Sequence, residues 1–288
     1  VVLIMTFFSL LFWAIFEQAG SSVNLFTDRN VDRVNESLLV TDADVGKTLE
    51  IDLTQEQLGF TIGGSVMTLD RLDKLRDQKQ AQASVEITKD HVGMGIAKAN
   101  EETKATTYQS LNPAYILVLG LVFTALWSLL GAWEPSTPVK FSLGLAQLGL
   151  GFGCFWLGAS GADDRGMVAV SWLYLGYLLQ TTGELCLSPV GLSMVTKLSP
   201  ARLVSTVMGM WFLATAFSAF LAAIIANFTG VDEHGGGDAG GIPIPLETVD
   251  IYGNVFGILA VTGLVSGAIC LVLSPFLKRW MHEGEDDD

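Results

Sequence analysis

Two acidic residues lie inside apolar stretches of this sequence and are the first candidates for chemistry. Glu184 lies near the middle of the apolar stretch 167–195, and Glu17 lies within the apolar stretch 1–26. A carboxylate at the centre of a membrane helix costs roughly 2.5–3.5 kcal/mol on insertion scales, so its presence there indicates a function. Each carboxyl group must bind a cationic group, bind a ligand or carry a proton.

Glu184 belongs to a polar stripe. Its members, at spacings of three and four residues, are Tyr174, Tyr177, Thr181, Glu184 and Ser188. This spacing places them on one helix face, and a polar face in a membrane must contact protein or a water-filled cavity. A satisfied hydrogen-bond seam between helices is the alternative, and it suits Tyr174 and Thr181 better than Glu184. Pro189 predicts a kink or a loosened turn beside the carboxylate.

A similar polar face surrounds Glu17. Trp13, Glu17, Ser21 and Asn24 follow at spacings of four, four and three residues. A carboxyl group that serves only structure near the membrane interface is the alternative interpretation. No Lys or Arg lies in the interior of the predicted spans, so a cationic partner of Glu17 would come from outside this chain.

Two further positions are candidates on weaker grounds. Asn112 precedes Pro113, and Asn followed by Pro is also an ordinary helix start. Trp211 shares a face with Thr215 and Ser218, although a Trp in a membrane helix more often packs or anchors at the interface.

The elements that would position these residues are membrane-spanning helices. The chain has 288 residues, is 50% hydrophobic and has a mean hydropathy of +0.46. The stretches of about 20 or more apolar residues cover roughly 1–26, 113–133, 139–160, 167–195, 203–228 and 251–277. We therefore expect an all-α integral membrane protein with six transmembrane helices. Because the chain starts inside an apolar helix, we expect that an N-terminal part is missing.

The charges outside these stretches predict orientation and partners. If residue 1 starts on the cytoplasmic side, the cytoplasmic connections carry Lys140, Lys197, Arg202, Lys278 and Arg279. The short outer loops carry Arg165, which fits the positive-inside rule with both chain ends cytoplasmic. A net charge of −14 argues against nucleic acid as a partner. The sequence lacks enzyme motifs and metal-ligand spacings, and its three cysteines suggest no disulfide framework.

The domain organisation follows from this pattern. We assign a transmembrane helix to 1–27, a long extracytoplasmic insertion to 28–111, five transmembrane helices to 112–278 and an acidic cytoplasmic tail to 279–288. Residues 49–53 alternate as a strand does, and 69–83 could form a charged, solvated helix. The insertion is interpreted first as a mobile loop and second as a small ordered subdomain that modulates access or binds a partner.

Four motifs resemble those of one transporter family. Residues 12–22 (FWAIFEQAGSS), 109–113 (QSLNP), 183–193 (GELCLSPVGLS) and 208–213 (MGMWFL) resemble, in order, helices seven, eight, ten and eleven of proton-dependent oligopeptide transporters. The stretch 134–138 (EPSTP) adds to the match. This resemblance implies the C-terminal six-helix bundle of the major facilitator superfamily.

The resemblance also implies roles for individual residues. Glu184 and Asn112 match residues that bind the amine of a peptide, and Glu17 matches a carboxylate that takes part in proton coupling. Further matches to the peptide pocket are Trp13 and Trp211, with Ser188 a weaker candidate. The family's basic residues for the peptide carboxylate belong to an N-terminal bundle that this chain does not contain, and the long insertion departs from the family pattern.

We therefore expect proton-coupled symport of di- and tripeptides across a bacterial inner membrane by alternating access, with no cofactor and with the missing N-terminal six-helix bundle as partner. Transport of another substrate, such as nitrate or a modified amino acid, is one alternative. A membrane scaffold or sensor that binds a partner through residues 28–111 is the other.

Overall fold

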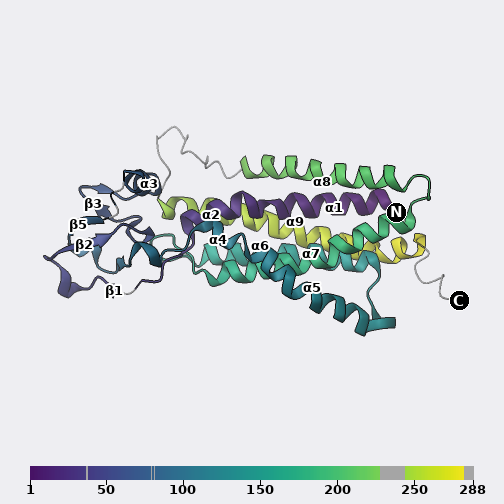
Figure 1. Cartoon of the computed structure of the whole chain (residues 1–288), viewed down its shortest axis with the longest axis horizontal. Helices are drawn as coiled ribbons and strands as arrows, with labels where there is room; N and C mark the ends of the chain where they lie inside the picture. Colours follow the sequence, from purple (N-terminus) through teal and green to yellow (C-terminus); the bar gives the residue numbers. More distant parts are fainter. Residues whose placement is uncertain (37, 79, 81, 228–243, 282–288) are drawn as a thin grey trace.

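The computed structural model describes residues 1–288 except 37, 79, 81, 228–243 and 282–288. It has two regions, a bundle of long helices and a subdomain rich in short strands that continues the bundle at one end (Figure 1). The first helix begins and the last helix ends at the opposite end of the bundle from the subdomain. Of the predicted tail 279–288, the part from 282 lies outside the described residues.

The predicted spans are present as helices with shifted ends. The first span is α1 (Val2–Phe16), the 3-10 turn η1 (Glu17–Gly20) and α2 (Ser22–Asn30) in succession. The others are α5 (Leu111–Leu130), α6 (Thr137–Ser160), α7 (Ser171–Leu198), α8 (Val204–Asn227) and α9 (Pro245–Trp280). A short helix, α4 (Ala105–Tyr108), precedes α5, and the 3-10 turn η6 (Gly131–Trp133) follows it.

Within the described part of the chain, five helical stretches are long and apolar enough to cross a membrane, namely 2–30, 105–130, 137–160, 204–227 and 245–280. The helix α7 has 28 residues, enough to span a bilayer of about 30 Å, but it is not one of these stretches. This helix carries the polar stripe around Glu184, which lowers its hydropathy. The chain is a multi-pass membrane protein, and its least apolar long helix carries the candidate site.

The core of the bundle lies where α6 packs between α7 and α9. Glycines permit this close approach, because a Cβ on Gly144 would lie 2.8 Å from the carbonyl oxygen of Gly183. On the other face of α6, a Cβ on Gly149 would lie 2.7 Å from the backbone nitrogen of Leu264. Small residues thus bring these helices together at both positions. Gly153, which has no heavy atom within 4 Å of such a Cβ, does not serve in this way.

The first span breaks at the candidate proton-coupling residue. The α-helix ends at Phe16, and residues 17–20 continue as the 3-10 turn before α2 begins at Ser22. A 3-10 segment inside a long helix commonly marks a hinge or a functional position. This break interrupts the single helical face that the spacing from Trp13 to Asn24 predicts, so these residues no longer follow one α-helical stripe.

Outside residues 37, 79 and 81, residues 31–104 form short strands, turns and a helix around a buried core, the arrangement that the second interpretation, a small ordered subdomain, expects. Its strands pair antiparallel as β1 (Leu38–Leu39) with β6 (Gly95–Ile96), β2 (Thr48–Asp52) with β5 (Gln82–Glu86), and β3 (Thr61–Ile62) with β4 (Ser65–Val66). One helix, α3 (Leu69–Asp77), packs against them. The predicted strand 49–53 and the predicted solvated helix are both present, the helix ending earlier than expected.

The subdomain has its own core and a repeated turn. The buried core is Val40, Ile51, Leu53, Leu58, Ile62, Met67, Leu69, Leu72, Val85, Ile87 and Met94. Three 3-10 turns, at 41–46, 54–59 and 88–93, each begin with a Thr whose backbone N–H is bonded by the side chain three residues later. Each ends on a Gly with φ between 85° and 90°, a conformation that favours glycine. This repeated turn is not among the features predicted from the sequence.

Candidate functional site

The site is built on a hydrogen bond between α5 and α7. The Nδ2 group of Asn112 donates to Oε2 of Glu184 at 2.9 Å and to the hydroxyl of Thr181 at 3.1 Å. Thr181 in turn donates to the carbonyl oxygen of Tyr177 at 2.8 Å. The bonds of Asn112 use only its N–H groups, and its carbonyl oxygen is a separate acceptor. A carboxylate beside an amide oxygen is a suitable arrangement for a group with several N–H donors.

Glu17 lies at the same site. Its exposed side chain lines a pocket of about 180 Å³ together with Phe16, Ala19, Gly20, Gln109, Asn112 and Tyr177. Because Asn112 is both in this pocket and bonded to Glu184, the structure brings the two predicted carboxylates to one place. The pocket is smaller than the roughly 300–1,000 Å³ of typical ligand pockets.

The other predicted residues are not all brought to the pocket. Trp13 is partly buried and packs edge-to-face against Phe16, a pocket residue, at 5.3 Å between ring centres. Trp211 is 4% exposed and lies in the helix core, its ring edge-to-face with Phe141 at 6.4 Å. It also covers Gly191, where a Cβ would lie 2.6 Å from the Trp211 ring. This geometry is that of core packing, the alternative considered from the sequence.

Ser188 is half-buried one turn after Glu184 on α7, beside Pro189. Its place on the predicted stripe holds, and the stripe contributes Tyr177, Thr181 and Glu184 to the site.

Four residues of the pocket were not predicted from the sequence, namely Phe16, Ala19, Gly20 and Gln109. Each appeared there only as part of a motif, residues 12–22 or 109–113. The break of the helix at Glu17 turns Phe16, Ala19 and Gly20 towards the pocket. Gln109 is an amide residue three positions before Asn112. This spacing is the only signal in the sequence that favours it as a pocket residue.

A larger groove of about 600 Å³ lies elsewhere in the bundle. It runs between α1, the end of α7 and α8, and its lining includes Leu10, Met210 and Phe217. The lining is almost entirely apolar and holds no titratable side chain. Such a surface suits lipid or another helix, so we place the chemistry in the smaller polar pocket.

Carboxylates also gather where the subdomain meets the bundle. Ligand atoms of Asp32, Glu36 and Glu56 lie within 4.8 Å of one another. Arg165, in the α6–α7 loop, supplies positive charge, with its Nη1 3.2 Å from Oε2 of Glu56. Burial raises the pKa of both Asp32 and Glu56. We assign this cluster to the attachment of the subdomain and not to a metal site.

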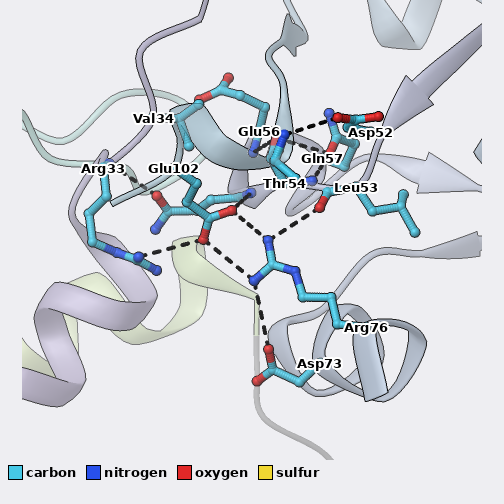
Figure 2. A network of polar contacts seen from close by, with 12 residues as sticks. Arg33, Val34, Asp52, Leu53, Thr54, Glu56, Gln57, Asp73, Arg76 and Glu102 are labelled. Carbon is cyan, nitrogen blue, oxygen red and sulfur yellow. Dashed lines mark hydrogen bonds and ion pairs between the residues drawn. The ribbon is translucent and has the colours of Figure 1, made fainter. Parts of the chain in front are cut away.

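A second polar network lies inside the subdomain. Arg33, Arg76 and Glu102 meet in it, and the carbonyl oxygen of Leu53 also accepts from Arg76 (Figure 2). Burial raises the pKa of Asp73 at its edge, and the neighbouring carboxylate of Asp28 acts in the same direction.

One protein-family model matches the part of the chain that carries most residues of the site. A family model described as the POT family matches residues 96–238, a range that begins near the end of the subdomain and includes Asn112 and Glu184.

Two curated proteins illustrate the similarity in sequence. A dipeptide and tripeptide permease A of Klebsiella pneumoniae (strain 342) is 36% identical over 198 residues, which are 69% of this chain and 37% of the permease. An uncharacterized transporter, YclF, of Bacillus subtilis (strain 168) is 40% identical over 180 residues, which are 62% of this chain and 33% of that protein. The chain thus spans about a third of the length of these relatives.

The fold is also similar to a solved transporter. A crystal structure of a peptide transporter POT in complex with sulfate matches with a TM-score of 0.61 and 26% identity. The match covers 96% of this chain and 39% of that chain.

Proposed function

The chain belongs to the POT family, and from this premise we propose that it forms one half of a proton-coupled symporter for di- and tripeptides. Its bundle has the fold of the C-terminal six helices of a major facilitator transporter. The observation that carries the proposal is the bond of Asn112 to Glu184 beside a pocket that also contains Glu17.

The pocket and the adjoining Glu184 together offer the acceptors that a peptide's ammonium group requires. The carboxylate of Glu184 supplies charge, and the carbonyl oxygen of Asn112 supplies a second acceptor directed by the fixed position of the amide. We assign the peptide amine to these two residues, with Tyr177 as a wall. Trp13, Ser188 and Trp211 remain predicted contacts, and Trp211 would act through the packing of α7.

Glu17 is assigned to the proton. It is exposed at a break between two helices, where a change of charge can alter the geometry of the hinge. In this proposal a cationic residue of an N-terminal bundle pairs with ionised Glu17, and protonation releases it. The small volume of the pocket supports a second wall supplied by that bundle.

The mechanism follows from a site placed between two bundles. The bundles rock about the site and expose it to each side of the membrane in turn. The proton gradient drives the cycle without a cofactor or covalent step, so the protein is not an enzyme. We place it in a bacterial inner membrane with both chain ends cytoplasmic and the subdomain outside.

The amine assignment is tested on the full-length protein in proteoliposomes. Wild type should take up a free dipeptide in preference to its N-acetylated form, and Glu184→Gln should raise the KM for the free dipeptide by about 10- to 100-fold, the loss of one hydrogen bond to a charged group. Equal uptake of both peptides by wild type overturns the assignment. Uptake of nitrate or a modified amino acid in place of peptides favours the alternative substrate classes.

The proton assignment has a separate test. Glu17→Gln should abolish accumulation driven by a pH gradient while exchange of peptide across the membrane at equal pH continues. Accumulation that depends on the gradient as in wild type would falsify the coupling role of Glu17. Glu184→Gln serves as the matched variant, since it should weaken both processes through affinity.

A further inference from the structure

The two ends of the inserted subdomain are joined to each other. Val34 and Glu102 form an antiparallel bridge, and the backbone N–H of Thr103 donates to the carbonyl oxygen of Arg33 at 3.0 Å. The side chain of Arg33 strengthens this junction, because its Nη1 donates to the carbonyl oxygen of Thr103 at 2.5 Å. The chain therefore leaves the bundle and returns to it through two paired segments, residues 33–34 and 102–103, which we call the neck.

Glu102 is the centre of that neck. Its Oε2 accepts from Nη2 of Arg76 at 2.5 Å and from the backbone N–H of Gln55 at 3.1 Å, and its Oε1 lies 3.5 Å from Nη1 of Arg33 (Figure 2). The side chain of Glu102 is 8% exposed and that of Arg33 is 3% exposed. Charge-assisted bonds in such a buried position are strong and directional, so one carboxylate holds both neck strands and α3 together.

The outgoing side of the neck is fixed to the bundle. The Nδ2 group of Asn30 donates to the carbonyl oxygens of Gly166 and Pro245, and its Oδ1 accepts from Thr248. The backbone continues this attachment, since Asp32 donates to Val168 at 2.9 Å. The end of α2 is thus tied to the α6–α7 loop and to the start of α9.

The returning side of the neck leads directly into the site. From Glu102 the chain enters α4, which packs against α2, and then reaches the pocket residues Gln109 and Asn112. The helix that follows, α5, is described over its whole length and has no fully buried residue. Its packing within this chain is mainly against α7, so the bundle alone holds it weakly.

From these contacts we propose that Glu102 and Arg33 are positioning residues that set Asn112 against Glu184 and Glu17. The neck links the segment from Glu17 through α2 to the segment from α4 to Asn112. It thereby fixes the distance between Glu17 and Asn112. The subdomain then holds Asn112 in position relative to Glu17 and Glu184, and the affinity for the peptide amine depends on this position. This inference rests on the proposed function for its transport readout.

The first test measures the position of α5 without any substrate. Spin labels on Leu117→Cys in α5 and Ile258→Cys in α9 occupy sites 77% and 67% exposed, while the native cysteines are buried. In the full-length protein, Glu102→Gln should broaden the distribution of distances between the labels. Asp70→Asn, which removes an exposed ion pair of the same subdomain, should leave the distribution as in wild type. An unchanged distribution in Glu102→Gln contradicts the proposal that Glu102 holds α5 in position.

The second test measures dipeptide uptake by the same variants. Glu102→Gln should raise KM on the order of tenfold, as a displaced hydrogen-bonding group does, with the maximal rate per folded protein within about twofold of wild type. A broadened distribution with an unchanged KM overturns the positioning role. If Glu102→Gln does not fold, Arg76→Gln removes one partner of the same carboxylate and gives the same comparison.

The two tests separate this inference from the proposed function. A wild type that transports no dipeptide contradicts the proposed function, and the label distances still decide whether the neck fixes α5.

Discussion

The helix bundle brings its backbone segments close by the absence of side chains, whereas the inserted subdomain holds its segments with polar side chains bonded to the backbone. At the α6–α7 contact, Gly144 and Gly183 leave room for each other's carbonyl oxygens. In the subdomain, Thr54 and Gln57 close a turn through the bond of the Thr54 N–H to Gln57 Oε1. Apolar lipid offers no hydrophobic force between helices, so the bundle relies on close packing, while the subdomain buries an apolar core from water.

This difference teaches where each region tolerates change. A bundle packed backbone to backbone cannot accept added atoms at its contacts, and a subdomain with a small core cannot lose them. The site depends on both, because Asn112 is reached from the subdomain and Glu184 is held by the bundle.

The largest expected effect comes from emptying the core of the subdomain. Leu72 is 0% exposed, and Leu72→Ala should cost about 2–5 kcal/mol, the usual range for such a truncation. Because the subdomain has its own core, its amides in β2 and β5 should lose protection from hydrogen exchange while those of α6 keep it. Equal loss of protection in α6 would show that the two regions unfold as one unit.

The helices were predictable from the sequence because hydropathy follows length and composition. Each predicted span is a helix within a few residues, with two exceptions. The first span is broken by the 3-10 turn at Glu17, and α9 begins at Pro245, outside the apolar window. The pair of Glu184 and Asn112 was predicted through the resemblance, and the structure joins the two by a hydrogen bond beside the pocket that Asn112 lines.

The rest depended on contacts that the sequence does not display. The 3-10 break at Glu17 has no Pro or Gly at its start, and it changes which neighbours face the pocket. Trp211 could be a ligand wall or a core residue, and only the bare Cα of Gly191 beneath its ring decides for packing. The order of the subdomain rests on pairings across long separations, such as that of Val34 with Glu102.

A matched pair of glycines in α6 tests the rule for the bundle. Gly149→Ala places a methyl group 2.7 Å from the backbone of α9 and should destabilise the protein by about 1–3 kcal/mol, as overpacking does. Gly153→Ala meets no atom within 4 Å and should be neutral or stabilise the helix by up to about 1 kcal/mol. Thermal unfolding in detergent measures both. If the two variants have the same melting temperature, the close approach of α6 and α9 is not what stabilises the bundle.

The stability of the subdomain should depend on pH through Glu56, which lies where the subdomain meets the bundle. Burial raises the pKa of Glu56 above its ordinary value of 4.5, and the carboxylates of Asp32 and Glu36 act in the same direction against the lowering effect of Arg165. The folded state therefore holds a proton that the unfolded state releases above pH 4.5, so the contribution of Glu56 to stability is greatest at low pH and falls as pH rises through the folded pKa.

The measurement is the urea midpoint of the subdomain, followed by hydrogen exchange, between about pH 4.5 and pH 7. Glu56→Gln should flatten the decline, whereas Glu50→Gln, at an exposed position of β2, should leave it unchanged. A midpoint of Glu56→Gln that declines with pH as steeply as that of wild type contradicts the prediction, because the decline would then come from other carboxyl groups of the subdomain.

The smallest expected effect concerns the exposed face of α3. Lys74 pairs with Asp70 at 2.6 Å, but its side chain is 68% exposed, and such i,i+4 pairs contribute about 0.3–0.5 kcal/mol. Lys74→Ala should therefore lower the unfolding free energy of the subdomain only slightly, and a cycle with Asp70→Asn isolates the pair from helix propensity. Leu72 lies between Asp70 and Lys74 on the same helix, so Leu72→Ala and Lys74→Ala compare burial with surface charge within one turn. A coupling energy above about 1 kcal/mol would mean that polar bonds stabilise even the solvated face of this subdomain, and would extend to its surface the contrast with the bundle.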